Sequence, residues 1–270
     1  MQLVDYSLQY YKYSHAGWES VQSKVISEAA VSLTVNGEIW LSFMCTPTDL
    51  EALAIGFLYN EGIIQSQTEL ASVQVCNSGE NIDVWLNHPV IKPTQWQRTS
   101  GCNGGVTRAD PQPLEKILPK SVKISPEMLL TAMDMLLQAQ ELYREARGIH
   151  CSALSNGKQI YLEAEDIGRH NTLDKLAGML LLKPIEIAPK ILLTTGRISS
   201  EMLNKAGRLE VEVVLSRTSP TTRSIELANQ LGITLIGYAL RTQLFVYTHP
   251  ERLMSADDLH SLHPLDVPAR

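Results

Sequence analysis

Alternating hydrophobic and polar residues predict paired β-strands in two places along the chain. In the first place, two alternating runs within residues 31–43 flank Asn36-Gly37. An Asn-Gly pair favours the left-handed dihedrals of a two-residue hairpin turn. A second Asn-Gly pair, at 156–157, separates two such runs within residues 151–164. We therefore expect one β-hairpin in each half of the chain.

Apolar residues at helical spacing predict the helices. Leu50, Leu53 and Phe57 begin one such pattern, which follows Pro47 and ends near Gly62. A second helix is expected to start at Ser125-Pro126-Glu127, where a capping residue, a proline and an acid coincide. The apolar stripe that follows predicts one continuous helix to Arg147, with Gly148 as its stop.

The residues before about Ile26 are polar and aromatic, and their pattern is irregular. Tyr10–Tyr13 fits a strand or an arm that packs against a partner, and the sequence does not decide between them. Two more strands are expected at Ser72–Cys76 and Ile82–Leu86. Together with the first hairpin and helix, they predict a small α+β region over residues 1–98.

Beyond Gly148 the expected elements alternate between helix and strand. Helices are predicted at 171–182, 199–209 and 221–231, and strands at 190–195, 211–216, 234–240 and 243–248. Such alternation builds a sheet with parallel strands and helices on both faces. We predict an α/β fold in which 125–250 form this mixed-sheet domain, 99–124 form a glycine-rich cysteine loop and linker, and 251–270 form a peripheral tail.

The charge balance limits the partners that the chain can attract. Its 23 Lys and Arg against 29 Asp and Glu leave a net charge of -6 and a pI of about 5.7. This acidity argues against broad binding to nucleic acid or to an anionic membrane. No apolar run approaches the roughly 20 residues of a membrane span, and the first residues do not resemble a signal peptide. We therefore expect a cytoplasmic protein with free thiols.

Two glycine–cation turns suggest a site for an anionic ligand. Gly168-Arg169-His170 and Gly196-Arg197 each lie where a predicted helix begins. A helix start leaves backbone N–H groups unpaired and carries the positive end of the helix dipole, so phosphate binds well there. Alternatively, both glycines only end strands and both arginines pair with carboxylates. Spacing alone leaves both interpretations open.

The element order of the second half is also that of zinc-dependent cytidine deaminases. Their chemistry requires H-x-E at one helix start and P-C-x-x-C at the next. Here the first start reads His170-Asn171-Thr172 and the second reads Gly196 to Ser200, without cysteine. We predict a deaminase-like C-terminal domain that holds no zinc, which disfavours a nucleotide deaminase or hydrolase.

A glycine-rich loop, Ser100-Gly101-Cys102-Asn103-Gly104-Gly105, lies between the two predicted regions. Glycines would let the chain move and expose the thiol, so Cys102 suits a chemical carrier. A plain linker with an incidental cysteine fits the composition equally well. Cys45, Cys76 and Cys151 lie in or beside predicted strands, and we expect them to be core thiols.

Several segments resemble the signatures of one family. Glu165-Asp166-Ile167-Gly168-Arg169-His170-Asn171-Thr172-Leu173-Asp174-Lys175 resembles the middle signature of the formate dehydrogenase accessory sulfurtransferases, the FdhD/NarQ family. Segments 195–202 (with Lys205-Ala206), 216–221 and 235–238 resemble its later signatures, and 57–63 is similar to its N-terminal helix. The resemblance follows the family's order over most of the chain and implies a deaminase-like fold without zinc.

The resemblance also implies an activity. Family members take sulfur from a cysteine desulfurase as a cysteine persulfide. They pass it to the molybdenum cofactor, a bis(molybdopterin guanine dinucleotide), before that cofactor enters formate dehydrogenase. The persulfide residue would be Cys102, and a homodimer is implied. Many members carry C-x-x-C in this loop, whereas Gly105 stands third after Cys102 here. Transfer would then run through Cys102 alone, or the protein is a non-catalytic module that binds the cofactor or a guanine nucleotide.

The candidate cofactor-binding residues lie where predicted strands end. The two turns contribute Arg169, His170, Arg197 and Ser199, although a structural role for His170 remains open. Ligands of open α/β sheets gather at strand ends, so the residues after the next strand are candidates too. These are Arg217, Thr218 and Ser219, and the family pattern adds Tyr238, Ala239, Leu240, Arg241, Thr242 and Gln243.

Overall fold

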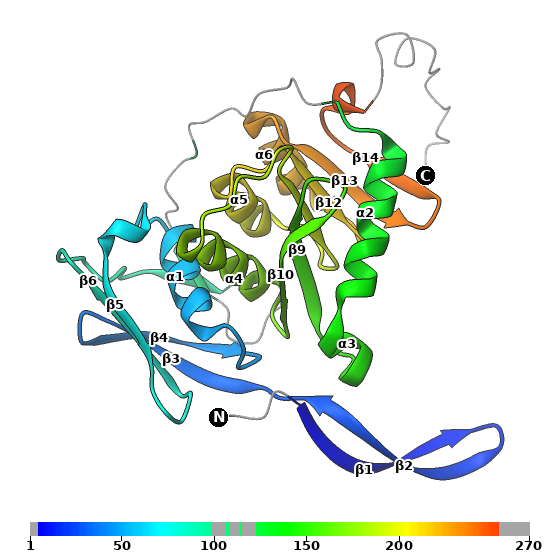
Figure 1. Ribbon diagram of the computed structural model, residues 1–270, viewed down its shortest axis with the longest axis horizontal. Helices are drawn as coiled ribbons and strands as arrows, with labels where there is room; N and C mark the ends of the chain where they lie inside the picture. Colours follow the sequence, from blue (N-terminus) through cyan, green and yellow to red (C-terminus); the bar gives the residue numbers. More distant parts are fainter. Residues whose placement is uncertain (1–4, 99–105, 109–113, 115–122, 254–270) are drawn as a thin grey trace.

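The computed structural model describes residues 5–98, 106–108, 114 and 123–253. Its centre is a six-stranded sheet in the order β10-β9-β11-β12-β13-β14 (Figure 1). Strands β11, β12 and β13 run parallel, and the flanking pairs are antiparallel. The strands are β9 (His150–Ser155), β10 (Ile160–Asp166), β11 (Ile191–Thr194), β12 (Val213–Ser216), β13 (Thr234–Leu240) and β14 (Gln243–Val246).

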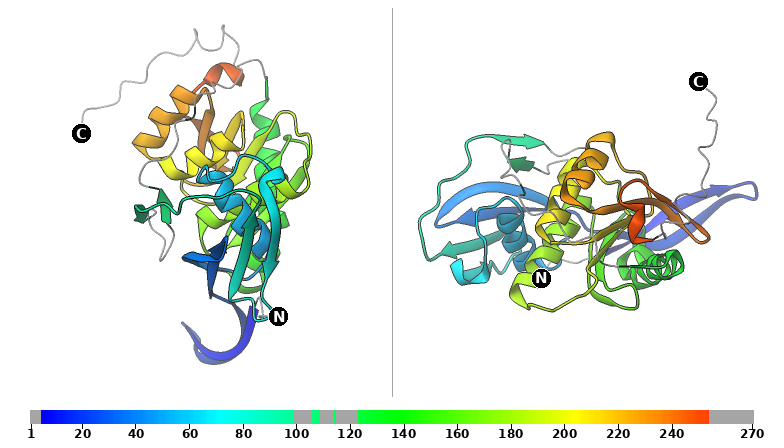
Figure 2. Two further views of the ribbon diagram at one scale, coloured as in Figure 1. Left: turned by 90° about the vertical axis from the view of Figure 1, so that its left-hand side faces the viewer. Right: turned by 90° about the horizontal axis from the view of Figure 1, so that it is seen from above.

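Helices cover both faces of this sheet (Figures 1 and 2). On one face, α2 (Pro126–Ala139) packs Leu129 and Met133 against the strands. The other face is covered by α4 (Arg169–Leu182), α5 (Ser200–Arg208) and α6 (Thr222–Leu231). Strand residues on both faces are therefore apolar, as in sheets that are buried on both sides. The predicted α/β fold with a mixed sheet is confirmed.

A smaller α+β region lies beside the main sheet (Figure 1). Its four strands have the order β4-β3-β6-β5, and α1 (Leu50–Asn60) shares their hydrophobic core. Asn36 and Gly37 both have positive φ between β3 and β4, as the Asn-Gly turn predicted. The strands are β3 (Ala29–Val35), β4 (Glu38–Cys45), β5 (Leu70–Val75) and β6 (Asn81–Leu86), and a 3-10 turn, η1 (Gln67–Glu69), precedes β5.

Two glycines let the two regions approach each other through α1 and α4. A Cβ atom on Gly56 would lie 1.7 Å from the carbonyl oxygen of Asp174. A Cβ atom on Gly178 would lie 1.9 Å from the carbonyl oxygen of Ala52. Each helix backbone thus touches the backbone of the other, and a larger residue at either position would force the helices apart.

We expect Gly56→Ala to lower the free energy of unfolding by about 1–3 kcal/mol or more, because backbone atoms cannot move aside as side chains can. Chemical denaturation measures the change. Gly207→Ala in α5 is a suitable control, since its Cβ would meet only the side chains of Leu114 and Leu231. An equal loss in both variants would contradict the close helix crossing.

The first described residues form an arm. β1 (Asp5–Ser14) and β2 (Gly17–Ile26) pair as a two-stranded ribbon that projects from the body (Figure 1). Tyr11, Tyr13 and Trp18 are exposed on it. The segment around Tyr10–Tyr13, which the sequence left undecided, is therefore a strand within an arm.

The prediction of one helix from Ser125 to Arg147 is wrong. The chain breaks at Gln140, and a second helix, α3 (Glu141–Ala146), follows. The carboxylate of Glu165 accepts hydrogen bonds from the backbone N–H groups of Leu142 (2.8 Å) and Tyr143 (3.1 Å). A side chain more than twenty residues away thus caps the new helix start, which local spacing does not reveal.

A short ribbon flanks the loop that contains Cys102, and the sequence did not predict it. β7 (Trp96–Arg98) pairs antiparallel with β8 (Val106–Arg108), with Arg98 opposite Val106. Cys102 itself lies outside the described residues.

After β14, the described part of the chain ends in a 3-10 turn, η2 (Pro250–Arg252). Among the helices in the described ranges, none is long and apolar enough to span a bilayer.

Candidate functional site

The segment 165–175 joins the two regions through a buried ion pair. Lys175 Nζ lies 2.7 Å from Asp166 Oδ2, and both side chains are fully buried. Lys175 also donates to the carbonyl oxygen of Thr46 (3.1 Å) and to Thr48 Oγ1 (2.9 Å). Asp166 Oδ2 accepts from the backbone N–H of Thr46 at 3.2 Å. The pair therefore fixes the chain that enters α1 against α4.

A second buried cluster lies farther along α4. Asp174 accepts from Asn60 Nδ2 (2.8 Å) and from Lys205 Nζ, which lies 2.6 Å from both carboxylate oxygens. Burial raises the pKa of Asp174 to about 6, although the Lys205 charge opposes the rise. Asp166, Asp174 and Lys175 thus connect α4 to the N-terminal region and to α5.

Protein groups satisfy part of both helix starts that were predicted to attract phosphate. At α4, Asp166 Oδ1 accepts from the backbone N–H of Gly168 and from Asn171 Nδ2, each at 2.8 Å. At α5, Ser199 Oγ accepts from the backbone N–H of Met202 and donates to Glu201. Ser199 is therefore a helix cap. An anion at these helix starts would therefore be attracted mainly by cationic side chains, and less by unpaired backbone N–H groups.

One edge of the main sheet brings the candidate residues together. The carboxyl ends of β10, β11, β12 and β13 lie along this edge, and the antiparallel strands β9 and β14 begin there. The cofactor-binding candidates through Ser219 follow the ends of β10, β11 and β12, and the later ones, Tyr238 to Gln243, span the end of β13 and the start of β14. We call this place the strand-end edge. It is where open α/β sheets bind ligands.

Arg169 packs against Gly196, the residue before Arg197, because Gly196 has no side chain. A Cβ atom on Gly196 would lie 3.0 Å from Arg169 Cβ and 3.3 Å from Arg169 Cδ. Arg169 is buried, whereas Arg197 is exposed. The two predicted turns are therefore parts of one cationic place.

His150 belongs to the same place, and the sequence analysis missed it. It is the first residue of β9 and lies opposite Asp166. Burial lowers its pKa, and the charges of Arg169 and Arg197 lower it further, while Asp166 opposes them. The predicted hairpin contained a usable signal: a residue just before its first strand must lie beside the carboxyl ends of the neighbouring strands.

Backbone hydrogen bonds connect the next two strand ends. Ser216 Oγ donates to the carbonyl oxygen of Gly196 at 2.7 Å, and the N–H of Arg217 donates to the carbonyl oxygen of Thr194 at 3.0 Å. The N–H of Tyr238 donates to the carbonyl oxygen of Thr218, also at 3.0 Å. Thr218 and Ser219 are half-buried, and Arg217 is exposed. The later signature segments thus lie side by side.

The last candidates follow an irregularity in β13. The register with β14 shifts between Gly237 and Leu240, and Tyr238 has a φ of 49°. Tyr238 is partly exposed and its ring centroid lies 5.3 Å from that of Phe245. Ala239 is fully buried in the core beneath α2, so its side chain does not reach the strand-end edge. The exposed candidates after it are Leu240, Arg241, Thr242 and Gln243.

His170 contacts Glu201 in α5, whereas Arg169 packs against Gly196. Its Nε2 atom lies 3.3 Å from Glu201 Oε2, and the ring is buried. Burial lowers the pKa of His170 to about 4, which the carboxylate of Glu201 only partly offsets. The ring is therefore neutral at pH 7, so its contact with Glu201 is not an ion pair.

This pKa predicts a loss of stability in acid. Unfolded His170 binds a proton below about pH 6.5, whereas the folded protein withholds it until about pH 4. Stability therefore falls as the pH falls, and from pH 7 to 5 this residue contributes a loss of about 2 kcal/mol. Between pH 7 and 5, the free energy of unfolding of His170→Gln, measured in urea, should fall by about 2 kcal/mol less than that of wild type. Equal slopes for the two proteins would contradict the assignment.

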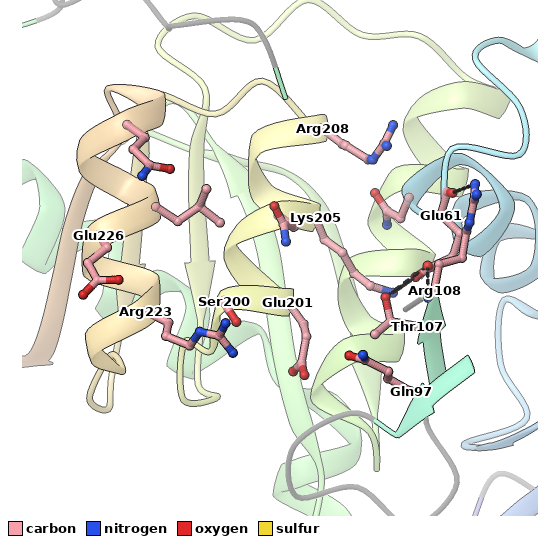
Figure 3. Close-up of a pocket in the computed structure, with 14 residues that line it drawn as sticks. Glu61, Gln97, Thr107, Arg108, Ser200, Glu201, Lys205, Arg208, Arg223 and Glu226 are labelled. Atoms are coloured by element: carbon pink, nitrogen blue, oxygen red, sulfur yellow. Dashed lines mark hydrogen bonds and ion pairs between the residues drawn. The ribbon is translucent and has the colours of Figure 1, made fainter. Parts of the chain in front are cut away.

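A pocket of about 500 Å³ lies beside the first turn of α5, where Ser200 and Glu201 line it (Figure 3). Its walls come from the end of α1, the β7–β8 ribbon, α5 and α6. Gln97 and Thr107, which face each other across the ribbon, both line it. Glu201 lines it too and contacts His170, the residue next to Arg169. The stem of the Cys102 loop therefore lines the same pocket as Glu201, which contacts α4 at the residue next to Arg169.

The described cysteines differ in character. Cys45 and Cys151 are buried, as predicted, and burial raises the pKa of both thiols, that of Cys45 to about 12. The expectation that Cys76 is a core thiol is wrong, because it is exposed just after β5. A hydrogen bond with Ser78 lowers its pKa, and its Sγ accepts from the N–H of Asn81 at 3.2 Å. In the described ranges, no three His, Cys, Asp or Glu side chains form a group that could hold a metal ion.

Comparison with known proteins identifies the family. The FdhD/NarQ family model matches residues 26–254. The chain belongs to the FdhD/NarQ family. Proteins named sulfur carrier protein FdhD from Staphylococcus aureus strains MRSA252 and Newman are each 34% identical to it over 238 residues, which cover 86% of this chain and 90% of the relative. The β1–β2 arm lies almost wholly outside the family match.

A solved structure shares the fold. It is a crystal structure from Desulfotalea psychrophila described as a formate dehydrogenase accessory protein. The two chains are 23% identical, with a TM-score of 0.75, and the match covers 93% of this chain and 100% of that one. The predicted fold and family resemblance are thus confirmed for this FdhD/NarQ member.

Proposed function

We propose that this FdhD/NarQ protein is a sulfur carrier that accepts sulfur on Cys102 from a cysteine desulfurase and delivers it to the molybdenum cofactor of formate dehydrogenase. The names of its S. aureus relatives support sulfur carriage. The observation that carries the proposal is the strand-end edge, where Arg169 and Arg197 supply positive charge beside His150. The stem of the Cys102 loop lines a pocket with Glu201, which contacts the residue next to Arg169.

The strand-end edge suits the proposed cargo, a bis(molybdopterin guanine dinucleotide). Each dinucleotide arm carries phosphates, and arginine binds phosphate through its planar fork of donors. Arg197 and Arg217 are exposed there, and the missing side chain of Gly196 leaves room for Arg169 at the start of α4. The partly exposed ring of Tyr238 offers an aromatic surface for a guanine base.

The sulfur chemistry would run through one thiol. The Cys102 thiolate attacks the terminal sulfur of the desulfurase persulfide, the donor's S–S bond breaks, and the donor cysteine leaves as a thiolate. On delivery, the terminal sulfur leaves Cys102 as sulfide, the thiolate is restored, and molybdenum supplies the two electrons. Gly105 stands where many relatives have a second cysteine, so this route forms no disulfide within the loop.

The setting of this activity is part of the proposal. The free thiols of Cys45, Cys76 and Cys151 suit a reducing compartment, which supports a cytoplasmic location. A homodimer, with the desulfurase and formate dehydrogenase as transient partners, follows from the family resemblance. The alternative is a module that binds the cofactor or a guanine nucleotide without carrying sulfur, which the single loop cysteine favours.

Maturation of formate dehydrogenase in cells tests the proposal. In a strain that lacks the native protein, we expect Cys102→Ala to abolish formate dehydrogenase activity. Cys76→Ala, which removes another exposed thiol, should retain the wild-type level. Full activity with Cys102→Ala would overturn sulfur carriage by this residue and leave the binding module as the function.

A further inference from the structure

Glu61, at the end of α1, holds the strand that follows the Cys102 loop. Its carboxylate accepts from Thr107 Oγ1 at 3.0 and 3.1 Å and from the backbone N–H of Arg108 at 2.8 Å. Its carbonyl oxygen accepts from Arg108 Nη1 at 3.3 Å. Thr107 and Arg108 are two of the three residues of β8, so Glu61 binds this strand through side chain and backbone together (Figure 3).

This attachment matters because the ribbon has little else to hold it. β7 and β8 form a sheet of two three-residue strands that pairs with no other strand in the described structure. An isolated strand pair of this kind is marginal in water. Trp96 of β7 contacts Phe57 of α1, with ring centroids 5.8 Å apart. A buried aromatic contact thus anchors one strand, and Glu61 anchors the other.

Glu61 is buried and lies beside Lys205 of α5. Glu61 is 4% exposed, and Lys205 Nζ lies 3.9 Å from its Oε1 atom. The same ammonium group contacts both oxygens of Asp174 in α4. Lys205 thus lies between two carboxylates, and its ammonium group is positioned to attract both of them. The strand β8 is connected through Glu61 and Lys205 to the helix that carries Arg169.

We propose that Glu61 is a positioning residue for sulfur delivery: by holding β8 against the end of α1, it fixes the β7–β8 stem, and so limits where Cys102 can lie relative to the strand-end edge. The inference rests on the proposed function. Cys102 is four residues from Arg98 and four from Val106, a span of at most about 14 Å. The position of the stem therefore limits where sulfur on Cys102 can go. Loading from an external desulfurase depends on access to the thiol, whereas delivery depends on this placement.

Glu61→Gln tests the inference. The amide keeps one acceptor oxygen and turns an NH2 group toward β8 or toward Lys205, so the hold on Thr107 and Arg108 weakens. We expect the Cys102 persulfide, followed by intact mass, to form within about twofold of the wild-type rate. Single-turnover delivery of labelled sulfur to the cofactor should slow by about 10- to 100-fold, the scale of a displacement of about 1 Å. Affinity for the cofactor should not change.

Two further variants make the test specific. Glu226→Gln is the same substitution in the same pocket, on α6 and without a described bond to β8, and should deliver sulfur at the wild-type rate. Thr107→Val removes one donor to Glu61 and leaves Lys205 and Asp174 untouched, so a smaller slowing is expected even if Glu61→Gln folds poorly. Wild-type delivery by both Glu61→Gln and Thr107→Val, or equal slowing by Glu226→Gln, would overturn the inference. Failure of wild type to load sulfur would instead contradict the proposed function.

Discussion

Replacement of Lys175 by methionine is expected to lower the free energy of unfolding by about 3–5 kcal/mol, because it leaves the buried carboxylate of Asp166 without its cation. Both side chains are fully buried and lie 2.7 Å apart. Methionine has a similar length, so the change removes charge and hydrogen bonds more than volume. The acceptors on Thr46 and Thr48 lose their donor at the same time.

Urea unfolding at pH 7, followed by circular dichroism, measures this loss. The double variant Asp166→Asn/Lys175→Met is the matched control, since it removes both charges and should recover part of the stability. A loss below about 1 kcal/mol in the single variant would show that this ion pair does not hold α1 and α4 together.

The second large effect concerns ligand binding at the strand-end edge. The double variant Arg197→Gln/Arg217→Gln is expected to weaken binding of a guanine dinucleotide or GDP by a hundredfold or more. Each hydrogen bond to a charged group contributes about 1.5–3 kcal/mol, and about 1.4 kcal/mol is a factor of ten. Both side chains are exposed, so the fold should be unaffected.

Isothermal titration calorimetry at fixed salt measures the affinity. Arg223→Gln is the control, because this arginine lines the pocket beside the β7–β8 ribbon and not the strand-end edge. Unchanged affinity in the double variant would place the nucleotide elsewhere. A loss in Arg223→Gln alone would place it in the pocket.

The sequence predicted features that depend on local patterns. Asn36-Gly37 requires positive φ at both residues, so the first hairpin could be located from two residues. Strands followed by Arg169, Arg197 and Arg217 had to end at one edge of a sheet with parallel strands, so the candidate site could be assembled without coordinates. The same rule places His150 at this edge, because it is the first residue of β9 and β9 runs antiparallel to its neighbours.

Features that depend on distant residues could not be predicted. The break at Gln140 arises from the carboxylate of Glu165, and the signature acids Asp166 and Asp174 find their partners in residues 46–60 and in α5. Much of the middle signature therefore stabilises the contact between the two regions. From the sequence, this signature was interpreted as a ligand-binding turn or as a structural one. Its Arg169 still suits the ligand-binding role.

Intact mass spectrometry tests the central proposal most directly. The protein is incubated with a cysteine desulfurase, its pyridoxal cofactor and cysteine, and wild type is compared with Cys102→Ala and Cys76→Ala. Sulfur carriage on Cys102 predicts a reductant-sensitive gain of one sulfur atom, about 32 Da, in wild type and Cys76→Ala and none in Cys102→Ala. No adduct in wild type, or the same adduct in Cys102→Ala, would contradict it.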